Sequence, residues 1–244
     1  MHHVIARLLP HAYHRAMPTM DPASHEVWHL LTRLGEAEIL LPAAAVVVLA
    51  LRGRGSTRRV VGLWLLLLGA AAAVTTATKV AFIGWGLGSP ALDFTGVSGH
   101  AMFAAAVIPM LLAALTPARP PRARRLAVAC GVALALGVGW SRLEVQAHTV
   151  SEVVAGVLLG GAVSATVLSQ AHLPQVRLNA WLPLGLVLWL ALMLPYAPPS
   201  RTHDVVTRLA LTLSGRQVPH TRSEFRAQRR TAAHSPAAGA DAKG

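Results

Sequence analysis

The chain has 244 residues, of which 54% are hydrophobic and only 13% are charged. Because an ordinary soluble domain carries about 25% charged residues, this composition excludes a typical soluble monomer. Lys and Arg outnumber Asp and Glu by 22 to 10, giving a net charge of +12. These cations lie in short clusters between apolar runs, without an aromatic-interleaved basic patch, so we expect no nucleic-acid partner.

Six apolar runs approach the length of about 20 residues that a helix needs to cross a bilayer. In chain order they cover approximately residues 34–51, 60–83, 100–115, 126–140, 149–169 and 178–196. The sequence therefore predicts an all-α integral membrane bundle of about six transmembrane helices.

This pattern also predicts how the chain is divided. The membrane domain is expected over residues 34–197, after an N-terminal non-cytoplasmic or interfacial segment at residues 1–33. A basic tail, residues 198–244, follows it. In this tail Asp204 is a plausible N-cap for a short interfacial helix, and the Ala/Arg/Gly-rich end is expected to be disordered.

The orientation of the bundle follows from its loops, because Lys and Arg accumulate in cytoplasmic connections. The connections after the first and third runs hold four arginines each, and Arg177 lies in the fifth. The connections at residues 84–99 and 141–148 contain Arg142 as their one permanent cation, so we expect them to face outward. The tail opposes this assignment, since seven arginines and one lysine follow Ser200.

Ionisable groups at membrane depth cost free energy and mark functional candidates. Here they gather where the apolar runs meet the outward connections. They are Lys79 at the end of the second run, His100 at the start of the third, Arg142 at the end of the fourth, and His148 and Glu152 at the start of the fifth, with Ser98 and Gly99 beside His100 and Ser141 beside Arg142. Cations, imidazoles, a hydroxyl and a glycine amide at one depth suit a phosphate group.

Two of these segments resemble motifs of the type 2 phosphatidic acid phosphatase family. Ser141-Arg142, five further residues, His148 and an acid four residues later match S-R-x-x-x-x-x-H-x-x-x-D. Val97-Ser98-Gly99-His100 is similar to P-S-G-H. The resemblance covers roughly residues 60–169.

The resemblance implies a metal-independent phosphatase without a cofactor. It makes His148 the nucleophile that becomes a phosphohistidine, and Glu152 the carboxylate that orients it. His100 would protonate the leaving oxygen and then activate water. The remaining residues would bind the substrate phosphate: Lys79, Ser98, Gly99 and Arg142.

The chain departs from the family pattern at several positions. In the first motif, K-x-x-x-x-x-x-R-P, Lys79 is present but Gly86 and Leu87 replace Arg and Pro. Val97 replaces the Pro of the second motif, and Glu152 the Asp of the third. We therefore expect weaker phosphate binding than in a full-motif member, or help from a residue distant in sequence.

The implied substrate is a lipid phosphate whose tail stays in the bilayer: phosphatidate, phosphatidylglycerophosphate or polyprenyl diphosphate. Short loops favour a bacterial inner-membrane protein with its site facing the periplasm. The missing Arg-Pro keeps open a lipid-phosphate-binding or transport accessory protein, and a lipid phosphotransferase is a further alternative.

Individual residues also have plain structural interpretations. Lys79 could simply mark the end of a span and have no role in binding. His25 and His29 are four residues apart, a spacing found in metal sites.

Overall fold

The computed structural model describes residues 22–51, 55–116, 120–170, 181–196 and 202–227. Its elements are the helices α1 (Pro22–Arg33), α2 (Ala37–Leu51), α3 (Gly55–Trp85), α4 (Gly99–Leu115), α5 (Pro121–Glu144), α6 (Val150–Leu168), α7 (Trp181–Tyr196) and α8 (Thr202–Ser214). A further helical turn covers residues 222–227. Over these ranges, extended pairing is limited to one isolated bridge between Ser89 and Phe94. The predicted all-α membrane bundle is confirmed.

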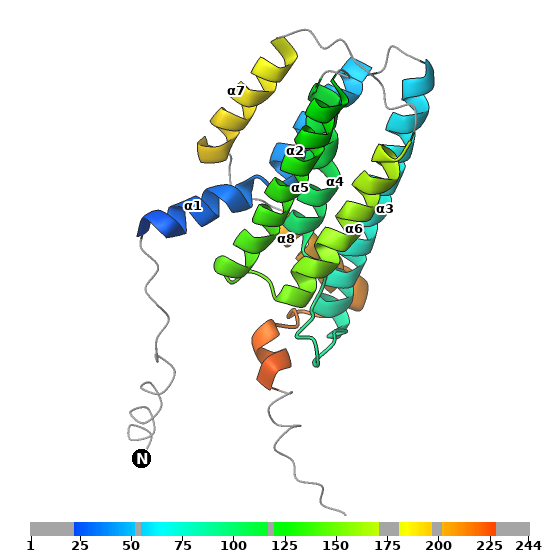
Figure 1. The fold of residues 1–244 in the computed structure, drawn as a ribbon. Helices are drawn as coiled ribbons and strands as arrows, with labels where there is room; N and C mark the ends of the chain where they lie inside the picture. The colour runs from blue at the N-terminus through cyan, green and yellow to red at the C-terminus, as the bar shows by residue number, and fades with distance from the viewer. Residues whose placement is uncertain (1–21, 52–54, 117–119, 171–180, 197–201, 228–244) are drawn as a thin grey trace, which may run out of the picture.

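Helix α4 forms the centre of the bundle, with α5 and α6 packed along its length (Figure 1). Eleven of its 17 residues are buried, and most of these are small or unbranched side chains. Trp64 of α3, itself 1% exposed, donates its indole N–H to the Ala106 carbonyl in α4 at 3.1 Å. The apolar core therefore surrounds the helix whose first turn contains Gly99 and His100.

Close backbone contact between α4 and α6 depends on two glycines. A Cβ on Gly156 would lie 2.6 Å from the Ser98 carbonyl oxygen, and a Cβ on Gly160 would lie 2.1 Å from that of Met102. Small residues four apart let membrane helices approach closely and pack through van der Waals contact. This contact fixes the start of α6, with Glu152, beside the start of α4.

Three helical segments are long and apolar enough to cross a membrane: Arg58–Trp85, Pro121–Glu144 and Val150–Leu168. Shorter apolar helices at Ala37–Leu49, Gly99–Leu115 and Leu184–Leu194 complete the predicted set. The fourth predicted span, 126–140, is too short at both ends, because α5 begins at Pro121 and continues to Glu144. At the N-terminal end, the charged residues Arg122, Arg124 and Arg125 extend the helix beyond its apolar part. At the C-terminal end, the polar residues Ser141, Arg142 and Glu144 do the same.

The two ends of the bundle differ. The C-terminal ends of α2, α4 and α6 lie at one end, and α1 and α8 lie toward the other (Figure 1). Helix α8 packs against α3 through Val206 and Ala210, which join Val80, Phe82 and Ile83 in a small apolar cluster. A helix is therefore present where the short helix was predicted, although it begins at Thr202, two residues before the predicted N-cap Asp204. Its interfacial position stays a prediction. Most of the predicted N-terminal segment and the predicted disordered end lie outside the described residues.

Candidate active site

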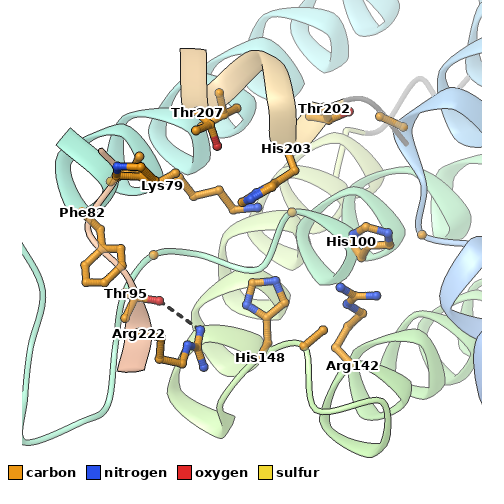
Figure 2. A pocket seen from close by; sticks show the side chains of 18 of the residues that line it. Lys79, Phe82, Thr95, His100, Arg142, His148, Thr202, His203, Thr207 and Arg222 are labelled. Atoms are coloured by element: carbon orange, nitrogen blue, oxygen red, sulfur yellow. Dashed lines mark hydrogen bonds between the residues drawn. The ribbon is translucent and has the colours of Figure 1, made fainter. Parts of the chain in front are cut away.

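A cavity of about 660 Å³ opens at the α8 end of the bundle (Figure 2). Five of the predicted site residues line it: Lys79, Gly99, His100, Arg142 and His148. They come from the end of α3, the start of α4, the end of α5 and the connection before α6. The structure thus brings together side chains from segments up to 69 residues apart in the chain.

The loop between α3 and α4 begins with a glycine C-cap. Gly86 has a φ of +68°, and its N–H donates to the Phe82 carbonyl at 2.7 Å while the Leu87 N–H donates to that of Ala81 at 3.2 Å. The bond from the Gly86 N–H to the carbonyl four residues earlier is that of an αL C-cap, in which glycine at the left-handed position ends a helix at little steric cost. Position 86, where the family motif has an arginine, is therefore a chain-reversal position in this protein.

The same loop is held against the start of α6. The Ser98 N–H donates to the Glu152 carbonyl at 3.1 Å, and the Ser151 hydroxyl donates to the Leu92 carbonyl at 2.8 Å. The Val97 N–H is bound by the Thr78 hydroxyl of α3 at 3.1 Å. These bonds fix the first turn of α4, and so the position of His100, relative to His148.

His148 and Glu152 form a direct pair. His148 Nδ1 lies 2.7 Å from Glu152 Oε2. The pairing follows from local structure, because Glu152 is the third residue of α6 and its carboxylate also accepts the Thr149 N–H at 3.2 Å, in the manner of a capping box. With Nδ1 engaged, Nε2 is the imidazole nitrogen left for the cavity.

The Glu152 carboxylate is fully buried and is surrounded by donors. Oε1 accepts the Thr95 N–H at 2.8 Å and the Thr95 hydroxyl at 2.5 Å. Oε2 accepts the Thr149 N–H and one terminal nitrogen of Arg222, the latter at 2.6 Å. Since these neighbours donate, the carboxylate accepts, and His148 Nδ1 carries the proton in their shared bond.

The protonation of His148 is set by its surroundings. Its side chain is 12% exposed. Burial lowers the pKa of His148 below its ordinary value, and the nearby cations Lys79 and Arg142 lower it further, although the bond to Glu152 opposes them. A lowered pKa favours the neutral imidazole, in which Nε2 has a free lone pair at neutral pH.

The turn between α1 and α2 forms the wall beside His100. A Cβ on Gly35 would lie 2.9 Å from both the Cβ and the carbonyl oxygen of His100, so only glycine fits this contact. Glu36 follows and also lines the cavity. Burial raises the pKa of Glu36, even though Arg33 lies 3.8 Å away. An acid thus faces the cavity near Arg142.

The four predicted phosphate-binding residues differ in where they lie. A Cβ on Gly99 would be 3.7 Å from Lys79 Nζ, so the ammonium lies next to the glycine at the start of α4. Arg142 lines the cavity, and its buried Nε has no partner among the residues described. Ser98 is fully buried, and in the described part of the chain it does not line the cavity.

Sequence reasoning missed several residues of the cavity. Thr95, Glu36 and Arg222 carry polar groups into it, and α8 adds His203 and Thr207 (Figure 2). The one available signal for Arg222 was the basic tail, whose charges opposed the loop-based orientation. Thr95 and Glu36 gave no signal, because a threonine in a loop and an acid before an apolar run are common.

In the part of the chain that the structure describes, no group of three or more His, Cys, Asp or Glu side chains is placed to hold a metal ion. His25 and His29 lie on α1 and are not among the residues that line the cavity.

The chain is similar in sequence to known proteins. A family model described as the PAP2 superfamily matches residues 82–174, which include the segments 98–100 and 141–152. A protein of Klebsiella pneumoniae named "Uncharacterized 22.5 kDa protein in cps region" is 35% identical over 205 residues, covering 82% of this chain and 98% of that protein. No solved structure gives a significant match.

The fold defines an all-helical membrane protein with a cavity, lined by both charged and apolar side chains, at one end of its bundle. The chain belongs to the PAP2 superfamily. Membership supports a phosphatase-like function.

Proposed function

We propose that the protein is a metal-independent lipid phosphate phosphatase that works through a phosphohistidine. The observation that carries this proposal is the His148–Glu152 bond of 2.7 Å, which leaves Nε2 of a neutral imidazole for a cavity that Lys79 and Arg142 also line. A nucleophile, its orienting acid and fixed positive charge are the requirements of phosphoryl transfer.

In the first step, His148 Nε2 attacks phosphorus and the bond from phosphorus to the lipid oxygen breaks. His100, which lines the same cavity, donates a proton to the departing oxygen. In the second step, water attacks the phosphorus of the phosphohistidine. His100 accepts the water proton, the N–P bond breaks, and inorganic phosphate leaves with both histidines restored.

Lys79, the Gly99 amide and Arg142 are proposed to bind the phosphate oxygens. Gly99 is the first residue of α4, where unpaired N–H groups and the helix dipole favour an anion. Arg142 has an unpartnered buried Nε that is available for this role. Ser98 supports the site through its backbone, since its buried side chain is set apart from the cavity.

The position of the cavity supports a lipid substrate. It lies at the end of a membrane bundle, where a phosphate reaches the polar helix ends while its acyl or prenyl chain stays in hydrocarbon. We propose phosphatidate, phosphatidylglycerophosphate or polyprenyl diphosphate as the substrate. The arginine-rich connections begin at the opposite end of the bundle, which favours a bacterial inner-membrane protein with the cavity on the periplasmic side.

The test uses purified protein in detergent with each of the three lipids and no added metal. The wild-type protein is expected to release inorganic phosphate, and His148→Ala to abolish release. His29→Ala, on α1 outside the cavity lining, is the control and should keep wild-type activity. Quenching in alkaline denaturant of protein incubated with labelled substrate should trap an adduct that is base-stable, lost on later acid treatment, and absent from His148→Ala.

Two other outcomes would replace this proposal. Binding of the lipid without release of phosphate would identify an accessory protein that binds lipid phosphates. Transfer of the label to an added lipid acceptor in preference to water would identify a phosphotransferase.

A further inference from the structure

The segment formed by residues 216–227, here named the C-terminal strap, lies against the active-site cavity and is anchored at three points. The His220 N–H donates to the Ile83 carbonyl at 3.0 Å. The Phe225 ring packs edge-on against Phe82, with centroids 5.5 Å apart. The third anchor is a forked ion pair between the Arg226 guanidinium and the Asp93 carboxylate.

Local sequence fixes the strap's direction at the cavity. The Thr221 N–H donates to the Glu224 carboxylate at 3.1 Å, and the Glu224 N–H donates to the Thr221 hydroxyl at 3.3 Å. This reciprocal capping box begins the helical turn at residues 222–227. Arg222 is therefore held at the first position of the turn, at the edge of the cavity that it lines.

Arg222 is tied to the catalytic pair by one of its nitrogens. Nη2 donates to Glu152 Oε2 at 2.6 Å and to the Thr95 hydroxyl at 3.0 Å. Within the described residues, Nε and Nη1 have no hydrogen-bond partner, and the side chain is 26% exposed. One edge of the guanidinium thus holds Glu152, while its other donors are available to a ligand in the cavity.

The charge balance of the cavity favours an anion beside Arg222. Without Arg222, the two cations Lys79 and Arg142 would have to balance both a dianionic phosphate and the buried Glu152 carboxylate. A guanidinium presents several N–H donors in a plane and can bind two phosphate oxygens at once. Arg222 adds that capacity next to the Nδ1-anchored imidazole of His148.

The strap also occupies the space beside position 86. A Cβ on Gly86 would lie 3.4 Å from the His220 ring, and the φ of +68° there disfavours any side chain. An arginine could therefore not be accommodated at position 86 without strain, whereas Arg222 reaches the cavity from the other end of the chain.

We propose that Arg222 is a substrate-phosphate ligand, delivered by the C-terminal strap, that also positions Glu152. The inference rests on the proposed phosphatase function for the identity of the ligand. It makes the strap part of the active site, and it makes phosphate affinity depend on a segment about 70 residues beyond the nearest catalytic residue.

The experiment compares full-length Arg222→Ala, Arg222→Lys and Arg216→Ala in detergent. It measures phosphate release from a short-chain phosphatidate and, separately, binding of inorganic phosphate by calorimetry. Arg222→Ala should raise both KM and the phosphate Kd by about 10- to 100-fold, the effect of losing a charged hydrogen bond. Added guanidinium should partly restore it, and Arg222→Lys should fall between wild type and alanine.

Arg216→Ala is the matched control, because it removes an exposed strap arginine that does not line the cavity and whose Nε donates to the Val218 carbonyl within the strap at 3.2 Å. It should change KM by less than about threefold, as expected for an exposed side chain outside the site. The inference is overturned if Arg222→Ala stays within twofold of wild type, or if Arg216→Ala reproduces its defect and guanidinium restores neither. If wild type binds phosphate but hydrolyses no lipid, the phosphatase proposal fails, and the binding measurements alone decide the role of Arg222.

Discussion

The Glu152 carboxylate accepts hydrogen bonds from five donors that belong to three separate segments: the α3–α4 loop, the α5–α6 connection and the C-terminal strap. Leaving a buried donor unpaired costs about 1–3 kcal/mol. The length of the side chain is therefore matched to its neighbours. This gives a physical account of why the chain has Glu where the family motif has Asp.

We expect Glu152→Asp to lower kcat/KM by about 10- to 100-fold, although it restores the family residue. A side chain one methylene shorter cannot reach Thr95, His148 and Arg222 together, so at least one buried donor loses its partner. Steady-state phosphate release measures the effect, with thermal unfolding as the check on folding. Activity equal to wild type would show that the carboxylate position is not critical.

A second prediction concerns pH and follows from the lowered pKa of His148. The imidazole must be neutral to attack phosphorus, so activity is retained below pH 6.5 and is lost as the pH falls through the lowered pKa. The measurement is the acid limb of kcat/KM for two substrates whose phosphate groups have different pKa values. A limb that moves with the substrate, or that lies above pH 7, contradicts this assignment.

The pairing of His148 with Glu152 was predictable, because both residues lie within one helical turn of a recognisable helix start. The contribution of Arg222 was not. Its contact with Glu152 spans 70 residues and depends on where α7 ends, how α8 packs and how the strap is capped. Ser98 shows the converse, since a motif position does not reveal whether its hydroxyl points into the cavity or into the core.

Among the elements, α4 and α6 determine the distance between the two histidines. Their contact has almost no free space at Gly160, whereas a Cβ on the adjacent Gly161 would meet nothing within 4 Å. The neighbouring glycines therefore form a matched pair with opposite surroundings.

Gly160→Ala is expected to destabilise the protein by about 1–3 kcal/mol, the usual cost of overpacking, and to lower activity by separating the starts of α4 and α6. Gly161→Ala should be neutral or slightly stabilising, because alanine has the higher helix propensity. Thermal unfolding in detergent and phosphate release provide the two measurements. Equal behaviour of the two variants would argue against a close α4–α6 contact.

Helix existence was predictable throughout the membrane domain, since apolar length is a strong signal. Helix ends were less so. The start of α5 was misplaced because Arg122, Arg124 and Arg125 were assigned to a loop, although Pro121 at the first position suits a helix start. Helix α1 was missed within the N-terminal segment, because its mixed polar composition resembles an irregular connection.

For the whole molecule, the position of the basic tail bears on the proposed loop-based orientation. The described part of the tail lies at the cavity end, and two of its arginines are neutralised there by Glu152 and Asp93. Lys and Arg bias orientation mainly in short loops and within about 15–20 residues of a span. Arg222 and Arg226 lie more than 20 residues after α7 ends at Tyr196, so they weigh less than the arginine clusters of the short loops.

This orientation predicts the labelling of single cysteines introduced in a Cys130→Ser background. Leu87→Cys, at an exposed position of the cavity-end loop, should react with a membrane-impermeant maleimide in intact spheroplasts. Arg122→Cys, at the opposite end, should react only after the membrane is permeabilised. The reverse pattern would place the cavity in the cytoplasm.

The anchoring of the strap also has a consequence for biogenesis. A nascent chain that has inserted its first five spans already contains both histidines, Lys79 and Arg142, but not Arg222. In the proposed orientation, the last span must insert and the tail must be exported before the strap can bind. Full affinity for the phosphate group would then arise only at the end of membrane assembly, so an incompletely inserted chain would bind lipid phosphates weakly.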